Sequence, residues 1–119
     1  MLLKELQISD GQILKVESSL SSLNLIFKDW KDQEWSIIFR NPLAIQSFSI
    51  EGEELSHIEI LSKDVFKDAT MEFFSDEKEE YFWCFSFYGV WCERPLLKII
   101  AKDNYEIISS FGEPVNKTV

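Results

Sequence analysis

Apolar and polar residues alternate along most of this chain in short runs, and polar segments separate one run from the next. Alternation with a period of two is typical of half-buried β-strands, because successive side chains of a strand point to opposite faces. The clearest unit is a predicted hairpin, in which residues 23–28 and 35–40 alternate and residues 29–32 turn the chain. Only residues 63–69, which carry Val65, Phe66 and Ala69, predict a short helical turn.

The stretch Tyr81–Trp91 is the most aromatic part of the chain, with seven aromatic residues among its eleven. Because both of its alternating faces are apolar, it is typical of a central strand that is covered on both sides. After Gly89 two continuations compete, a tight hairpin or a longer connection through residues 89–95. We favour the longer connection, with a return strand at 96–102, because Pro95 interrupts the tight alternative.

The remaining segments extend this β pattern. Residues 3–8 are ambiguous, and further strands are predicted at 12–17, 44–50, 55–61, 70–75 and 105–109. In the run 44–50 we expect Ala44, Phe48 and Ile50 to share a face. We therefore expect one mainly β domain over residues 1–119, an antiparallel sandwich or partly open barrel of eight to ten short strands in meander order. Residues 112–119 are predicted to be a frayed tail.

The net charge is the feature of the composition that bears most on function, because 21 acidic and 12 basic residues give a net charge of −9. That sign repels nucleic acid and anionic membrane surfaces, and it attracts a basic protein partner or a cation. A simpler role for the charge is to keep the domain soluble. The first ten residues do not resemble a signal peptide, so we expect a cytoplasmic location with reduced thiols.

Candidate catalytic chemistry is sparse. The single histidine, His57, is expected at a solvent-facing strand position, and Cys84 and Cys92 have only Arg94 as a basic neighbour in sequence. The acidic turns could hold calcium weakly, but they lack the EF-hand spacing, and a solvated loop is the commoner role. No zinc, nucleotide or hydrolase motif is present, so we predict a non-enzymatic protein with no cofactor, metal or catalytic residue.

Three polar turns are the candidate protein-binding sites. Trp30 is a large aromatic residue in a polar turn, where it could anchor a partner or fold back on its own hairpin. The acidic turns would speed the docking of a basic surface. The predicted binding residues are Asp29, Trp30, Asp32, Glu51, Glu53, Glu54, Asp76, Glu77, Glu79 and Glu80.

The runs at residues 8–14, 23–27, 35–41 and 96–101 together resemble small bacterial all-β proteins of uncharacterised type, some of which are immunity proteins of polymorphic toxin systems. This resemblance implies an inhibitor that covers a basic toxin surface. The alternative is a ligand-binding barrel whose pocket is lined by Tyr81, Trp83, Tyr88 and Trp91. A homodimer through exposed sheet edges stays open for both hypotheses.

Overall fold

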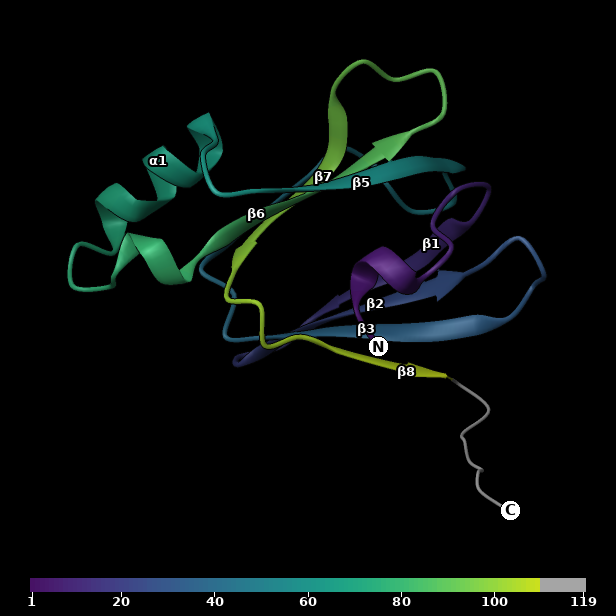
Figure 1. Ribbon diagram of the computed structural model, residues 1–119, viewed down its shortest axis with the longest axis horizontal. Helices are drawn as coiled ribbons and strands as arrows, with labels where there is room; N and C mark the ends of the chain where they lie inside the picture. The colour runs from purple at the N-terminus through teal and green to yellow at the C-terminus, as the bar shows by residue number, and fades with distance from the viewer. Residues whose placement is uncertain (110–119) are drawn as a thin grey trace.

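The computed structural model describes residues 1–109, which form two four-stranded antiparallel sheets packed face to face (Figure 1). The first sheet has the order β1 (Gln12–Ser18), β2 (Ser22–Lys28), β3 (Glu34–Arg40) and β8 (Glu106–Ser109). The second has the order β4 (Ala44–Ser47), β7 (Pro95–Ala101), β6 (Trp83–Gly89) and β5 (Leu55–Leu61). One helix, α1 (Val65–Phe73), and two 3₁₀ turns, η1 (Leu3–Glu5) and η2 (Glu79–Tyr81), complete the described part. The predicted mainly β sandwich is confirmed, and its sheets do not close into a barrel.

The core lies between the two sheets and follows directly from the alternation. The inward residues of the inner strands have no solvent exposure; they are Leu23, Leu25, Phe27, Ile37, Phe39, Phe85, Phe87, Leu97 and Ile99. The rings of Phe39 and Phe85 meet edge to face across the sheets, with centroids 4.9 Å apart. Each such side chain contributes roughly 1.5–3 kcal/mol by leaving water, so this layer dominates the stability of the fold.

The edges of the two sheets meet at one corner, where β1 approaches β5. The backbone N–H of Asp10 donates to the oxygen of Leu55 at 2.9 Å, and the N–H of Leu55 donates to the oxygen of Gly11 at 2.7 Å. Gly11 is required at this approach, since a Cβ there would lie 2.4 Å from the ring of Phe27 and 2.7 Å from the backbone oxygen of Lys28. This corner fixes the turn before β5 against the first sheet.

The aromatic stretch forms the interior strand β6, as its two apolar faces predict. Phe85 and Phe87 lie in the main core, and Cys84 lies on the opposite face in a second cluster with Ile100. The strand begins later than predicted, because Tyr81 belongs to η2, and it ends at Gly89, where the favoured longer connection begins. The longer connection to β7 is confirmed, since β6 pairs with Pro95–Ala101.

The predicted strand at 70–75 is wrong, because α1 continues to Phe73. The Asp64 carboxylate caps the helix by accepting a hydrogen bond from the N–H of Phe66 at 2.8 Å. Met71 packs against the second cluster, while Phe73 is 86% exposed, so these residues follow a helical period and not a strand alternation.

The meander order holds only for β1–β2–β3 and β5–β6–β7. β4 pairs with β7, and β8 pairs with β3, so the chain changes sheets after β3 and again after β7. β4 ends at Ser47, and the predicted common face of 44–50 is lost, because Ile50 is buried while Phe48 is 60% exposed. Residues 112–119, the predicted tail, lie outside the described residues. Within residues 1–109, no helix has the length and apolar content needed to cross a membrane.

Candidate functional site

The three predicted binding turns lie at two ends of the sandwich. The turn at 29–32 and the turn at 51–54 belong to the same end, because Lys28 pairs with Gln12 and Gln12 bridges to Glu54. The acidic segment 76–80 follows α1 at the opposite end (Figure 1). The predicted residues therefore do not form one surface.

Asp29 is a structural residue of its own hairpin. Its carboxylate is buried and accepts hydrogen bonds from the backbone N–H of Lys31 and of Gln33, both at 2.9 Å, and from the Trp35 indole N–H at 3.1 Å. Trp30 is 57% exposed beside it, with the Lys31 ammonium 5.1 Å from the ring centroid. Of these turn residues, Trp30 and Asp32 remain accessible to a partner, whereas Asp29 does not.

The acidic segment 76–80 is partly neutralised by lysines. Glu79 lies 3.4 Å from the ammonium of Lys63 and 3.8 Å from that of Lys67. The Lys67 side chain is almost fully buried and also donates to the backbone oxygen of Ser62 at 2.8 Å. These contacts connect η2 to α1. Glu79 therefore has a structural role, because it helps to hold the helix in place.

The acidic turn at 51–54 differs, because its carboxylates are less engaged. Glu51 accepts a hydrogen bond from the backbone N–H of Val16 at 2.8 Å. Glu53 and Glu54 are exposed and form no ion pair among the described residues. The turn adjoins the β6–β7 loop, since the N–H of Val90 donates to the backbone oxygen of Glu54 at 2.9 Å.

Trp91 lies in this loop and is 99% exposed. The N–H of Cys92 donates to the oxygen of Gly89 at 3.2 Å, which closes a β-turn with Trp91 as its third residue. The φ of Trp91 is 71°, as in a type II turn, where glycine or asparagine is favoured at this position. A bulky residue in this left-handed conformation costs about 1–3 kcal/mol.

Other left-handed residues in residues 1–109 do not present such a conflict. Asp10, Asp32 and Asn41 adopt positive φ angles, and aspartate and asparagine tolerate this conformation best after glycine. Ser49, with φ 54°, is exposed, and its side chain is small and polar. Trp91 is thus the bulky exception, with an apolar ring in water and a strained backbone beneath it.

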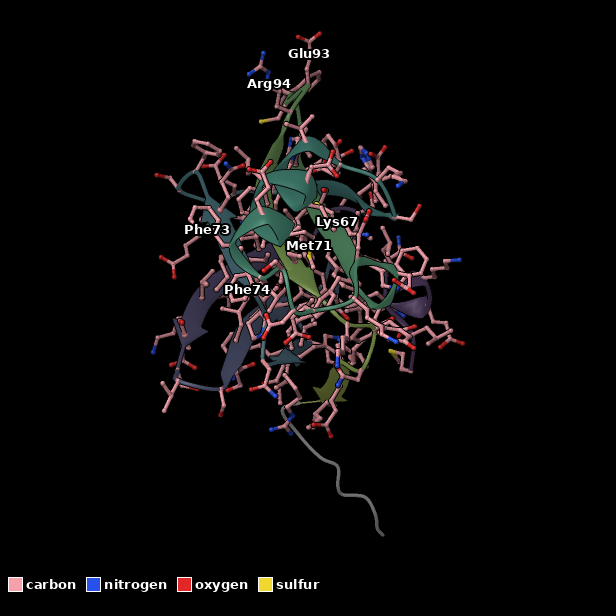
Figure 2. The ribbon with its side chains drawn as sticks, turned by 90° about the vertical axis from the view of Figure 1, so that its left-hand side faces the viewer. Lys67, Met71, Phe73, Phe74, Glu93 and Arg94 are labelled. Atoms are coloured by element: carbon pink, nitrogen blue, oxygen red, sulfur yellow. The ribbon has the colours of Figure 1, made fainter. Side chains whose placement is uncertain are left out.

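An open groove of about 780 Å³ lies beside the loop. Phe48, which is 60% exposed, lines it together with Cys92, Glu93, Arg94 and Leu96. Figure 2 shows Glu93 and Arg94 projecting at the far end of the loop, away from α1. We call the residues Phe48, Glu51, Glu53, Glu54, Trp91 and Glu93 the Trp91 surface.

Sequence reasoning missed the two aromatic members of this surface as interface residues. The sequence places Trp91 at the end of the aromatic stretch, in the favoured connection 89–95, and considers it only as a pocket residue; it predicts Phe48 to share a strand face with Ala44 and Ile50. The signal for Trp91 was present in Gly89, since a glycine at the end of an aromatic run is typical of a strand that gives way to a turn. No signal of this kind was present for Phe48, whose exposure depends on the pairing of β4 with β7.

The thiol and imidazole candidates have structural surroundings. Cys84 is fully buried, and burial raises the pKa of its thiol to about 11, so the reactive thiolate is scarce at neutral pH. His57 stacks on the ring of Tyr88 with centroids 4.4 Å apart, and its Nε2 lies 3.6 Å from Glu59. Because His57 and Glu59 lie exposed on the edge strand β5, water competes for both contacts.

The four aromatic residues of the predicted ligand pocket are dispersed. Tyr81 belongs to η2, Trp83 packs against the main core, Tyr88 stacks on His57, and Trp91 lies in the β6–β7 loop. In the part of the chain from 1 to 109, no group of three or more histidine, cysteine, aspartate or glutamate side chains could hold a metal ion. The Trp91 surface is therefore the arrangement with the most evident capacity for binding.

Comparisons with protein-family models, with curated proteins and with solved structures found no match to this chain.

Proposed function

We propose that this chain is a non-enzymatic binding protein that docks the Trp91 surface on a positively charged protein partner. The specific form that we propose is immunity-type inhibition, in which the docked domain covers the working surface of a basic toxin. The observation that carries the proposal is Trp91, a fully exposed tryptophan in a left-handed turn position.

The energetics of Trp91 favour an anchoring role. An aromatic side chain buries about 150–250 Å² in an interface, which corresponds to roughly 4–6 kcal/mol at about 25 cal/mol per Å². In the free molecule none of this is realised, because the side chain is 99% exposed. A partner with an apolar pocket would recover it, and tryptophan is among the residues most enriched at interface hot spots.

The charges around Trp91 favour a basic partner. Glu53, Glu54 and Glu93 are exposed; Glu54 contacts the β6–β7 loop through Val90, Glu93 lies in that loop, and Arg94 is the loop's one basic residue. The negative potential of this end adds to the net charge of −9 and would steer a cationic surface toward the tryptophan. The exposed ring of Phe48 and the adjacent groove give the partner a second apolar contact.

The test compares wild type with two matched single variants, Trp91→Ser and Trp30→Ser, as immobilised baits in an extract of the native cells. Both variants remove an exposed tryptophan, but only the first lies on the Trp91 surface. Each captured basic protein is then purified and its affinity measured by calorimetry. We expect Trp91→Ser to weaken the binding of a true partner by about 30-fold or more, and Trp30→Ser to leave it within about threefold.

Ionic strength and toxicity complete the test. Raising salt from about 50 mM to about 300 mM should weaken binding by about tenfold or more, because the attraction is between exposed charges. A toxin partner should arrest growth when expressed alone and be harmless when co-expressed with wild type, but not with Trp91→Ser. Failure to capture any basic protein, or equal binding by Trp91→Ser, would contradict the proposal.

A further inference from the structure

Within residues 1–109, no helix or loop covers the outer face of the first sheet. α1 packs on β6 and β7 through Phe66 and Met71, so it covers part of the outer face of the second sheet only. Figure 1 shows no described element beneath β1, β2, β3 and β8 on the side away from the core. This face is thus a four-stranded surface with side chains open to a partner.

The centre of the face is uncharged and mixes isoleucines with small polar residues, because Ile38 pairs with Asn24 and Ile26 pairs with Ser36. Ile26 and Ile38 point outward from the inner strands β2 and β3, since their neighbours Leu25, Phe27 and Ile37 point into the core. Ile108 extends this uncharged strip onto β8 and is 47% exposed. Uncharged side chains in the middle of an open sheet can be buried by face-to-face sheet packing at a lower cost than charged ones.

The face carries no net charge, although the molecule as a whole carries −9. Its outward basic residues are Lys15, Lys28 and Arg40, and its outward acidic residues are Glu17, Glu34 and Glu106. Two internal ion pairs involve only these residues, Lys15 with Glu17 at 3.1 Å, and Arg40 with Glu106. A basic partner gains no attraction here, whereas a second copy meets no repulsion from this face.

The strand register places the charges in a self-complementary pattern. Glu17, Asn24, Ile38 and Glu106 form one row across the sheet, and Lys15, Ile26, Ser36 and Ile108 form the next. Consider a two-fold axis that lies in the plane between two copies, perpendicular to the strands and midway between these two rows. This axis places each row of one copy opposite the other row of the second copy. Lys15 then lies opposite Glu17 of the second copy, and Glu17 lies opposite Lys15 of the second copy.

The same axis also exchanges the two outer rows. Ser22 with Arg40 forms the row at one end, and Lys28 with Glu34 forms the row at the other. Arg40 therefore lies opposite Glu34 of the second copy, and Lys28 lies opposite Ser22 of the second copy. No pair of like charges is opposed anywhere in this arrangement.

We propose that this face is a homodimer interface, in which two copies pack their first sheets together about that two-fold axis. Three strands of seven residues and one of four, at about 4.8 Å spacing and about 3.3 Å per residue, give a footprint of roughly 400 Å² per copy. Since a standard interface buries about 800 Å² per partner, the dimer is weak and depends on concentration. The inference stands apart from the proposed function, because it uses none of the residues of the Trp91 surface.

The experiment measures the oligomeric state of the purified protein by sedimentation equilibrium, from about 1 µM to about 1 mM. We expect wild type to pass from monomer to dimer over this range. Ile38→Lys should weaken dimerisation by about tenfold or more, because it replaces an apolar side chain at the centre of the interface by a charged one that must lose water. Its thermal unfolding, measured in parallel, shows that the monomer is still folded.

Glu17→Lys tests the proposed axis against general electrostatics. The side chain is 47% exposed, so the substitution does not disturb the core. It lowers the net negative charge and would strengthen dimerisation if only the total charge mattered. About the proposed axis it opposes Lys15 to a second lysine, so we expect dimerisation to weaken by about threefold or more.

Two further variants serve as controls. Lys15→Glu combined with Glu17→Lys restores opposite charges across the axis, and its dimerisation should return to within about twofold of wild type. Glu77→Lys makes the same change of charge away from the face, and its dimerisation should not weaken. A protein that stays monomeric at about 1 mM, a dimer unaffected by Ile38→Lys, or one strengthened by Glu17→Lys would overturn the proposal.

Discussion

Replacing Asp29 by alanine should destabilise the protein by about 2–4 kcal/mol, although the residue lies in a surface hairpin turn. Its carboxylate accepts hydrogen bonds from the N–H groups of Lys31, Gln33 and the Trp35 indole. A hydrogen bond to a charged group contributes about 1.5–3 kcal/mol, and an unpaired buried donor costs a comparable amount. The Lys31 N–H can turn to water because that residue is exposed, so we count mainly the other two. Gln33 and Trp35 are only partly buried, so each of these bonds is counted at about 1–2 kcal/mol, which gives the total of about 2–4 kcal/mol.

Asparagine at the same position should cost less, about 1–2 kcal/mol, because its amide oxygen can still accept from the two backbone donors. Its amide NH₂ group would then face the Trp35 indole N–H, so two hydrogen-bond donors would oppose each other and the indole would lose its acceptor. The order of stability is therefore wild type, Asp29→Asn and Asp29→Ala. This order would not follow if Asp29 served only as an exposed interface charge.

The assay is equilibrium unfolding in urea, followed both by tryptophan fluorescence and by circular dichroism. With a slope of about 2 kcal/mol per M, the alanine variant should lower the midpoint by about 1–2 M without changing the slope. Asp32→Asn is the matched control, since the Asp32 side chain is 83% exposed and asparagine tolerates its left-handed backbone. It should stay within about 0.5 kcal/mol of wild type. An alanine variant within that same margin would refute the structural role of Asp29.

Three further predictions concern single residues. The pKa of Asp64 lies below its ordinary value of 3.8, because hydrogen bonds from Lys98 and the helix backbone, with the charge of Lys98, outweigh the opposite effect of burial. Its ionised form therefore stabilises the fold above pH 3.8. Asp64→Asn should lose about 1–2 kcal/mol of stability at pH 7 in urea melts, and this deficit should shrink as the pH falls below 3.8 through the lowered pKa of the wild-type carboxyl. In native protein, iodoacetamide should modify Cys92 and spare Cys84, because the Cys84 thiol is buried and has a pKa of about 11. Cys84 should react only after urea unfolds the chain. Equal labelling of the two cysteines in native protein, measured by mass spectrometry of the digest, would contradict this prediction. Gly11→Ala should lower the free energy of unfolding by about 1–3 kcal/mol, because its Cβ would overlap a core ring and a backbone oxygen. An unchanged urea midpoint would contradict the close approach at this position.

The sandwich could be predicted because each strand of its core satisfies one local rule. Leu25 and Phe27 on β2 and Ile37 and Phe39 on β3 alternate with less buried residues, so the pattern alone selects the buried face. The return of the chain to β7 was predicted for a similarly local reason, the missing N–H of Pro95. Local rules of this kind do not depend on which strands become neighbours.

Strand order and helix length could not be predicted, since they depend on contacts between distant residues. The segment at 70–75 has the composition of a strand, but Asp64 starts a helix ahead of it, and Met71 finds a buried partner in the cluster of Cys84 and Ile100. In the same way, only the pairing of β4 with β7 leaves Phe48 exposed. Tertiary packing overrides local propensity in both cases.

The sequence predicted the acidic residues of the candidate site but did not predict its exposed aromatic residues, and the reason is physical. A carboxylate in a turn remains exposed in nearly any fold, so Glu53 and Glu54 could be assigned to the surface from composition alone. An aromatic residue is assigned to the core by the same reasoning, and Trp91 breaks that rule. Conflicts of this kind, in which strain and apolar exposure coincide without benefit to the fold, are expected where binding has shaped the sequence.

The distribution of charge separates the two proposed surfaces. The outer face of the first sheet is neutral, so the whole excess of negative charge lies elsewhere, and the exposed glutamates around Trp91 contribute to it. A homodimer through the neutral face would leave both Trp91 surfaces free, because no residue of the Trp91 surface lies on β1, β2, β3 or β8. Self-association and the capture of a basic partner therefore need not compete. A dimer would offer two anchoring tryptophans to a partner with repeated binding sites, and simultaneous engagement would raise the apparent affinity without any new contact.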